Sequence, residues 1–235
     1  MEVQGMRLGL EGVEIKRGNW HLSAEGSFTE GVHLISGDIG SGKSTLALMM
    51  AGLFSAASGS VICDRVSSLM ISFQFPEYHI TGTTVGEECE SWGLDPTIIL
   101  SSINLEAKRD YDPFRLSRGE LKRLHLACVL ANQYDLLILD EPFSSLDVCE
   151  KQRICNILSG CSHGITILFT HEQAIFPRVG HIWEIEDGRL RYCGSPPEGL
   201  QNWHHIPSLI RTMVASGKIP MNLSPDDLKE AACRT

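Results

Sequence analysis

Residues 37–45 read Gly-Asp-Ile-Gly-Ser-Gly-Lys-Ser-Thr, which fits the phosphate-loop pattern G-x-x-x-x-G-K-[ST]. Glycines allow the backbone to curl until successive N–H groups point at a polyphosphate. The lysine then places its ammonium group near the β- and γ-phosphates, and the serine hydroxyl can bind Mg²⁺. The sequence therefore predicts a nucleoside-triphosphate site that contains Gly37, Asp38, Gly40, Ser41, Gly42, Lys43, Ser44 and Thr45.

The sequence on both sides of this loop supports the prediction. Residues 32–36 are typical of a short strand that enters the loop, and residues 45–51 of a helix that leaves it. The N-terminus of such a helix directs a partial positive charge toward the phosphates. The alternative, a glycine-rich turn with a surface lysine, would not require a strand before the loop and a helix after it. Nucleotide binding is therefore the favoured interpretation.

Composition and charge limit the class of protein. The chain has 235 residues, of which 43% are hydrophobic and 21% charged, which is typical of a globular α/β domain. A net charge of −9 without a basic run argues against broad nucleic-acid binding. No apolar stretch approaches the roughly 18 residues that span a bilayer, and residues 1–5 lack the features of a signal peptide. We expect a cytosolic protein that can sit on a membrane through a partner.

The hydrophobic pattern indicates a mixed fold. Residues 7–30 alternate polar and apolar side chains, which predicts short antiparallel strands. Residues 136–139 and 165–169 are unbroken apolar runs, as expected for parallel strands buried on both faces. Residues 147–160 carry apolar side chains on one helical face, so the three segments predict a βαβ unit.

Two further features concern the C-terminal third of the chain. Residues 182–192 predict a β-hairpin that turns at Asp187-Gly188. Residues 204–235 predict two short helices separated near Pro220, with Ser224 as the N-cap of the second.

Two carboxylates follow the apolar strand 136–139. Ligands of open α/β sheets bind beyond the carboxyl ends of the strands, where the phosphate loop also opens. Asp140 can therefore hold the hydration shell of Mg²⁺ opposite Ser44. Glu141 is placed to polarise a water for in-line attack on the γ-phosphate.

The segment Leu116-Ser117-Arg118-Gly119-Glu120 has two compatible interpretations. Ser117 followed by Glu120 is a capping box that starts the next helix. A helix N-terminus with a free hydroxyl and a close-approach glycine is also an anion site. The phosphate loop alone does not identify the anion that this second site meets.

The order of these segments resembles the ATP-binding-cassette ATPases over roughly residues 8–192. The ordered segments are the phosphate loop, Gln74, the sequence Leu-Ser-x-Gly-Glu, residues 136–142, residues 144–147 and His171. The resemblance implies an α/β P-loop NTPase cassette with a mostly parallel core sheet, an N-terminal antiparallel β-subdomain and a small α-helical subdomain. It implies an ATP-binding domain at residues 1–200, with the helical subdomain at about 76–130, and a short helical extension at 201–235.

The same resemblance implies an ATPase in which two cassettes pair head to tail, each ATP lying between the phosphate loop of one chain and the signature of the other. Ser117, Arg118, Gly119 and Glu120 form that signature for ATP on the partner chain. Gln74 and His171 join Glu141 as catalytic residues, and Asp147 acts across the dimer interface. The Mg²⁺ ligands implied are Ser44, Gln74 and Asp140.

Residues 73–78 and the tail at 206–220 are similar to the energy-coupling-factor branch, which feeds vitamin and transition-metal importers. This similarity implies ATP and Mg²⁺ as cofactors and a second ATPase chain, identical or paralogous, as a partner. It also implies integral membrane subunits that hold the chain at the inner face of the cell membrane, and no nucleic acid.

Three departures from the family pattern remain. Arg118 stands where the family usually has glycine, and its charge can either add a phosphate contact or obstruct closure. The aromatic residue expected to stack on adenine is replaced by Arg17, with Trp20 close by, and either can cover the base. The stretch from Gln74 to Leu116 is also shorter than expected for the helical subdomain of this branch, which bears on membrane docking.

Other functions fit less well. DNA-repair cassettes carry a long coiled-coil insertion, and translation cassettes occur as two in one chain; neither feature is present. A non-hydrolysing binding module is opposed by the intact Glu141, Gln74 and His171. The alternative that stays open is a soluble ATPase for cofactor assembly or another non-transport role.

Overall fold

A computed structural model describes residues 5–18, 20–160 and 164–233. Residues 1–4, which carry part of the signal-peptide argument, lie outside the described residues. The strands form one nine-stranded sheet in the order β4-β1-β2-β9-β8-β3-β7-β6-β5. Their bounds are β1 Arg7–Arg17, β2 Trp20–Thr29, β3 Gly31–Gly37, β4 Ser58–Asp64, β5 Leu69–Ser72, β6 Leu136–Asp140, β7 Ile165–Phe169, β8 His181–Glu186 and β9 Arg189–Gly194.

The centre of the sheet is parallel. Strands β8, β3, β7, β6 and β5 are neighbours that run in one direction, and every residue of β6 and β7 is buried. Strands β1 and β2 pair antiparallel, as do β1 and β4. The prediction of a mostly parallel core with an N-terminal antiparallel part is confirmed.

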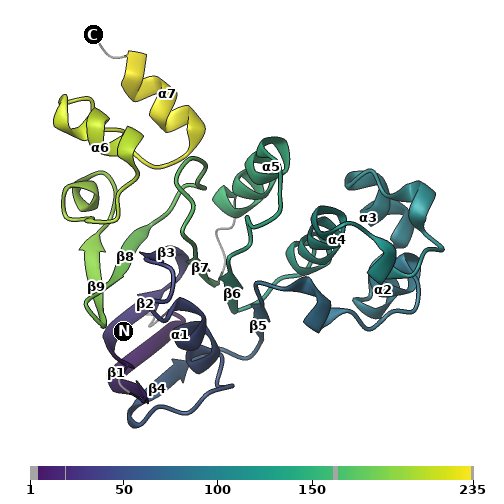
Figure 1. Ribbon diagram of the computed structural model, residues 1–235, viewed down its shortest axis with the longest axis horizontal. Coiled ribbons are helices and arrows are strands. Elements are labelled where there is room, and N and C mark those ends of the chain that lie inside the picture. Colours follow the sequence, from purple (N-terminus) through teal and green to yellow (C-terminus); the bar gives the residue numbers. More distant parts are fainter. Residues whose placement is uncertain (1–4, 19, 161–163, 234–235) are drawn as a thin grey trace.

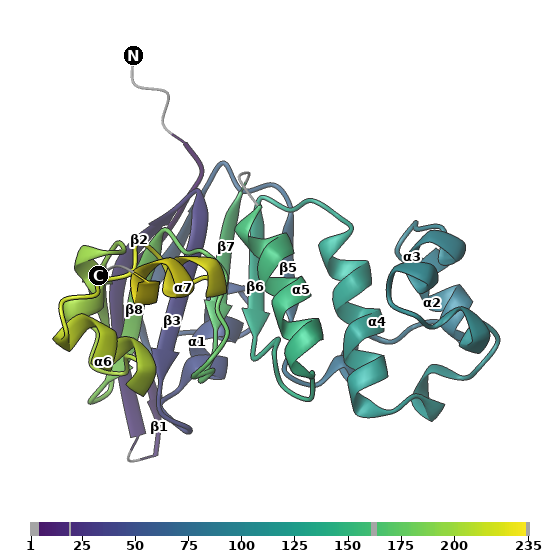
Figure 2. The same ribbon diagram turned by 90° about the horizontal axis from the view of Figure 1, so that it is seen from above.

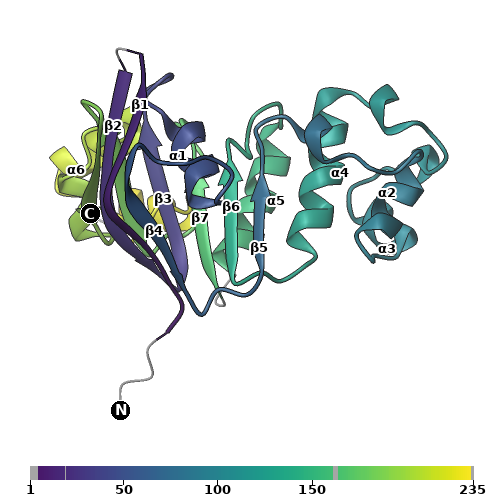
Figure 3. The same ribbon diagram turned by 90° about the horizontal axis from the view of Figure 1, so that it is seen from below.

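Helices cover both faces of this sheet. Their bounds are α1 Lys43–Met50, α2 Val85–Ser91, α3 Pro96–Ser102, α4 Arg118–Leu130, α5 Val148–Ser159, α6 Ser208–Ala215 and α7 Pro225–Cys233. Figure 2 shows α5, α6 and α7 on one side of the strands, and Figure 3 shows α1 on the other. Helix α1 packs with β1 and β2 into one apolar cluster, whereas α5, α6 and α7 share a second cluster. The centre of the sheet is therefore buried between two hydrophobic layers.

Helices α2, α3 and α4 lie to one side of the sheet, beyond β5 (Figure 1). They have an apolar cluster of their own, which includes Val85, Leu100 and Leu124. Helix α4 also contributes Leu126 and Val129 to the apolar cluster that α5, α6 and α7 share. It therefore connects the helical part to the strands that carry the site. The predicted limits at residues 76–130, 1–200 and 201–235 stay predictions.

The two local predictions for the C-terminal third agree with the structure. Asp187 and Gly188 both have positive φ, 48° and 69°, as a type I′ turn requires between β8 and β9. The backbone N–H of Asp227 donates to Ser224 Oγ at 3.3 Å, so Ser224 caps α7. Among the described residues, no helix is both long and apolar enough to cross a membrane.

Candidate nucleotide-binding site

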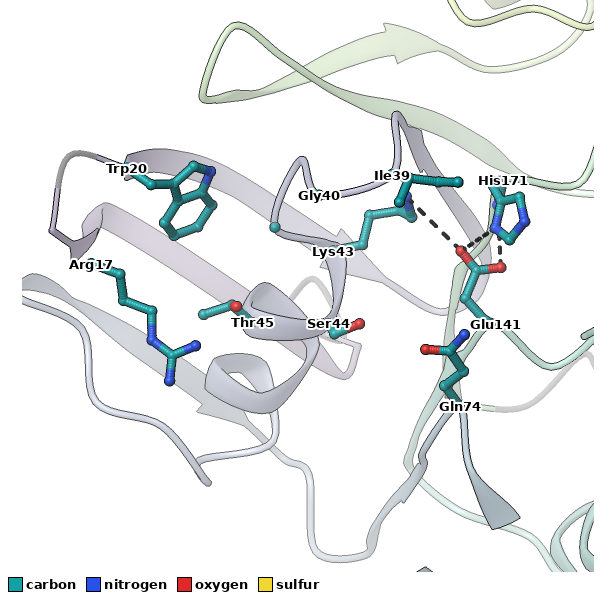
Figure 4. Close-up of a pocket in the computed structure, with 11 residues that line it drawn as sticks. Arg17, Trp20, Ile39, Gly40, Lys43, Ser44, Thr45, Gln74, Glu141 and His171 are labelled. Atoms are coloured by element: carbon teal, nitrogen blue, oxygen red, sulfur yellow. Dashed lines mark hydrogen bonds and ion pairs between the residues drawn. The ribbon is translucent and has the colours of Figure 1, made fainter.

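A cavity of about 440 Å³ opens at the carboxyl ends of the parallel strands (Figure 4). The phosphate loop follows β3, Glu141 follows β6, His171 follows β7 and Gln74 follows β5. Parallel strands bring their carboxyl ends to one edge of the sheet, which is where such folds bind ligands. The lining residues are Arg17, Trp20, Ile39, Gly40, Gly42, Lys43, Ser44, Thr45, Gln74, Glu141 and His171.

The phosphate loop is curled tightly into this cavity. Gly42 has a φ of +105°, and a Cβ atom there would lie 2.3 Å from the ring of Trp20. Only glycine fits such a position, because both the backbone conformation and the space exclude a side chain. Lys43 begins α1 and is buried, with its Nζ donating to the carbonyl oxygens of Gly37 at 2.7 Å and Asp38 at 3.0 Å. Its ammonium group therefore lies across the mouth of the loop.

Asp140 and Ser44 form a pair that suits a hard cation. Asp140 ends β6 with its side chain buried, and a hydrogen bond joins it to Ser44. Burial is the main cause that raises the pKa of Asp140, and the Ser44 contact opposes it. Its buried Oδ1 has no hydrogen-bond partner within the described parts of the chain. An unpaired carboxylate oxygen beside a hydroxyl matches the oxygen ligands that Mg²⁺ prefers.

The carboxylate of Glu141 is held by three contacts, two from His171 and one from Lys43. Its Oε1 lies 2.7 Å from His171 Nδ1 and 3.9 Å from Lys43 Nζ, and its Oε2 accepts from the His171 backbone N–H at 3.3 Å. The residue has a positive φ of 48°, and its own N–H donates to Phe169 on the neighbouring strand. The carboxylate therefore points into the cavity at a fixed distance from the lysine. Gln74 extends into the cavity beside it (Figure 4).

The signature residues lie outside this cavity. Ser117 is the N-cap of α4, and it forms a reciprocal capping box with Glu120. Glu120 also bonds to Lys108 Nζ at 2.6 Å, and this is the main cause that lowers its pKa to about 2. A Cβ atom at Gly119 would lie 2.9 Å from the carbonyl oxygen of Ser145, so this glycine permits a close approach. The capping interpretation is confirmed, and within one chain the segment does not reach the phosphate loop.

The remaining predicted residues have partners of their own. Asp147 is the N-cap of α5 and accepts from the N–H of Glu150 at 2.9 Å. Arg17 lies over the ring of Phe54, with its Cζ 5.5 Å from the ring centre. Trp20 lies against Gly42. Both Arg17 and Trp20 line the cavity, so either stays available to the base.

Sequence reasoning missed a contact between the C-terminal segment and the phosphate loop. Trp203 Nε1 donates to the hydroxyl of Ser36 at 2.6 Å, immediately before the loop. His205 lies between Glu184, at 3.1 Å, and Asp38 of the loop, at 3.6 Å. The pairing of Ser36 with Glu184 in neighbouring strands brings these groups together. No local sequence pattern predicts these contacts, because they depend on this strand pairing.

Comparisons with known proteins agree with the arrangement. The family described as ABC transporter matches residues 27–144. The energy-coupling factor transporter ATP-binding protein EcfA1 of Thermotoga maritima is 32% identical, over 72% of this chain and 73% of its own. Two solved structures are similar in fold. The cbiO1 protein of Clostridium perfringens, part of the ABC transporter complex cbiONQ, has a TM-score of 0.63 at 23% identity, covering 83% of this chain and 92% of its own. A bacterial Atm1-family ABC exporter with ATP bound has a TM-score of 0.68 at 20% identity; the match covers 81% of this chain but only 39% of the exporter.

Proposed function

This chain belongs to the ABC transporter family, as an ATPase of its energy-coupling-factor branch, and on that premise we propose that it powers the import of a vitamin or a transition-metal ion. The observation that carries the ATP-hydrolysis step of this proposal is the group formed by Lys43, Glu141 and His171 at the phosphate loop. A cation for the phosphates and a carboxylate for the attacking water stand in one cavity. This combination is what hydrolysis of a nucleoside triphosphate requires.

Each group has a task in this reaction. Backbone N–H groups of the loop and the N-terminus of α1 bind the phosphates, and Lys43 adds a cation. Glu141 orients water and accepts its proton, and His171 contacts the γ-phosphate from the end of β7. Mg²⁺, held by Asp140, Ser44 and Gln74, would neutralise charge on the β- and γ-phosphates. The unpaired Oδ1 of Asp140 supports this ligand set.

The proposed working unit contains two ATPase chains. Ser117 and Gly119 are separated from the phosphate loop of their own chain, so they are available to ATP on a second chain, identical or paralogous. Head-to-tail pairing around two ATP molecules gives each nucleotide a loop from one chain and a signature from the other. Asp147, at the start of α5, acts at that interface. Closure by shared ligands is a sufficient account of the motion that drives transport.

Arg118 is expected to strengthen this closure. It is the first residue of α4 and is exposed, and no ion-pair partner is found for it in the described residues. A guanidinium at a helix N-terminus adds a charged hydrogen bond to a phosphate. Arg118→Gly should therefore weaken ATP-dependent dimerisation about tenfold, near the lower range for a hydrogen bond to a charged group. Sedimentation with ATP, in chains that also carry Glu141→Gln, measures this dimerisation. Arg118→Ala is the control that separates the loss of charge from the flexibility of glycine. Unchanged dimerisation would show that Arg118 does not contribute to closure.

The membrane subunits are proposed to dock beside Gln74. Phe75 and Tyr78 are 51% and 75% exposed, and their rings make an edge contact 6.3 Å apart. Exposed aromatic pairs of this kind are typical anchors of protein interfaces. Docking there would hold the chain at the inner face of the membrane and couple the partner to the residue beside Glu141.

Purification in a gentle detergent tests the proposed function. An integral membrane protein should accompany the tagged chain, and Tyr78→Glu should lower its recovery at least about fivefold, the effect of roughly 1 kcal/mol at an interface anchor. Leu209→Glu is the matched control, because Leu209 is also exposed but lies on α6. A soluble homodimer that retains full ATPase activity and brings down no membrane protein would instead favour a cofactor-assembly ATPase.

A further inference from the structure

Lys122 is a buried lysine for which the proposed reaction has no task so far. It lies on α4, five residues after Ser117, and only 1% of it is exposed. Its Nζ donates to the carbonyl oxygens of Phe73 at 3.2 Å and Gln74 at 3.0 Å. A buried charge is stable only when it is paired or hydrogen-bonded. Lys122 meets that need through the segment that carries Gln74.

A second contact fastens the same segment to α4. The rings of His79 and His125 stack with their centres 4.4 Å apart. His125 Nε2 lies 2.9 Å from the hydroxyl of Ser72, at the end of β5, and the N–H of Phe73 donates to His79 Nε2 at 3.0 Å. Residues 72–79 are therefore attached to α4 at two places, through Lys122 and through His125.

The electrostatic surroundings agree with this position. Burial lowers the pKa of Lys122 to about 8, and the carboxylates Asp140, Glu141 and Glu77 oppose that shift. Two of these carboxylates belong to the nucleotide site. The Lys122 ammonium contacts the backbone of Gln74 and does not line the cavity, whereas the Gln74 side chain extends into the cavity beside Glu141 (Figure 4).

We propose that Lys122 is a positioning residue, which holds Gln74 in the nucleotide cavity and ties it to the helix that begins with the signature. The inference rests on the proposed function, because it assigns Gln74 to the Mg²⁺ site and the signature to ATP on a second chain. A movement of the α4 N-terminus on contact with that ATP is transmitted through Lys122 to the backbone of Gln74. The two nucleotide sites of a dimer are thereby coupled through the buried side chain of Lys122, beside the attachment that His125 makes.

The first experiment replaces the ammonium with a neutral chain of similar length. In Lys122→Met, the Mg²⁺ concentration for half-maximal ATPase activity should rise at least about tenfold, since Gln74 loses a charged hydrogen bond to its carbonyl. ATP binding without Mg²⁺ should stay unchanged, because the phosphate loop is intact. Lys218→Met is the matched control: that lysine also donates to a carbonyl, of Ala232 at 2.9 Å, but lies in the C-terminal segment.

A double-mutant cycle separates positioning from general stability. If Lys122 acts through Gln74, then adding Lys122→Met to Gln74→Ala should change the Mg²⁺ requirement less than about twofold, because coupled residues are not additive. Lys122→Gln, which keeps hydrogen-bond donors but no charge, should fall between the native chain and Lys122→Met. Additive effects in the cycle, or an unchanged Mg²⁺ requirement in the folded Met and Gln variants, would overturn the proposal. A chain that folds with neither replacement would show that Lys122 serves the fold itself, and would overturn it too.

Hydrogen exchange keeps this test distinct from that of the proposed function. Backbone amides of residues 73–79 should exchange at least about tenfold faster in Lys122→Met, because their attachment to α4 is weakened. Amides of α5 serve as the internal reference. This measurement needs no transport and no second chain. A chain that hydrolyses no ATP but shows faster exchange in 73–79 would contradict the proposed function and leave the attachment by Lys122 standing; unchanged exchange would contradict the attachment.

Discussion

Glu141→Gln is expected to lower the rate of ATP hydrolysis at least about 100-fold, the contribution of a positioned general base. ATP binding should survive, because the groups that meet the phosphates are unchanged. A dimer that closes around ATP and hydrolyses it slowly should therefore accumulate. The substitution changes one oxygen for an NH₂ group and keeps the size of the side chain.

The surroundings of Glu141 explain why the effect should be specific. In the native chain the His171 N–H donates to Glu141 Oε2 at 3.3 Å. The side-chain oxygen of the glutamine variant can still accept this hydrogen bond. The carboxylate that would take the proton of water is lost, and with it the charge that lies 3.9 Å from Lys43. Position is thus conserved while basicity is removed, so the loss should appear in kcat rather than in KM.

Phosphate release at saturating MgATP measures kcat. Equilibrium binding of ATP measures the affinity, which should be unchanged. Glu25→Gln on β2 is the matched control, because Glu25 is exposed and remote from the cavity. A fall of less than about tenfold would be too small for a lost general base, and the role would then pass to another group of the site. His171→Ala tests the neighbour that holds the carboxylate.

The parallel core could be predicted from the sequence because its signals are local. A strand buried on both faces is a nearly continuous apolar run, and β6 and β7 show this with Asp140 and Thr166 as their only polar residues. The turn at Asp187-Gly188 is equally local, since its residue types tolerate positive φ. The phosphate loop and the acidic pair Asp140 and Glu141, at the end of β6 and directly after it, have equally local signals. Consecutive residues in the sequence are sufficient to recognise these features.

Features that depend on distant partners could not be predicted in this way. Strand β4, Ser58–Asp64, has no buried residue, so it shows no alternation, and it is defined only by its pairing with β1. Lys122 was missed for a related reason: a lysine on an amphipathic helix usually faces water. Its spacing with His125 and Val129, three and seven residues later, is a signal for the buried face. The carbonyls of residues 73 and 74 and the nearby carboxylates, all distant in the sequence, explain why a charge is stable there.

Lys43→Met is expected to weaken ATP binding about 10- to 100-fold, the range of a lost hydrogen bond to a charged group. In the structure the Lys43 ammonium donates to two carbonyls of its own loop, 2.7 and 3.0 Å away. Bound phosphates offer stronger, charged acceptors at the same place, so the ammonium can exchange neutral partners for anionic ones. Burial lowers the pKa of Lys43, and Glu141 opposes that shift most strongly among the carboxylates. Removal of the ammonium therefore affects the phosphates and Glu141 together.

Titration with a fluorescent ATP analogue measures the affinity, and thermal unfolding of the same samples checks the fold. Lys229→Met serves as the control, since Lys229 is exposed on α7. Lys43 serves both the phosphates and the general base Glu141. In Lys43→Met the rate of hydrolysis should therefore fall by a larger factor than the affinity for ATP, whereas Glu141→Gln should change the rate alone. The double variant should then hydrolyse ATP little more slowly than Glu141→Gln at saturating nucleotide, because the two residues act as a unit. Unaltered ATP affinity in a folded Lys43→Met chain would contradict the role of this lysine and, with it, the position of the phosphates in the cavity.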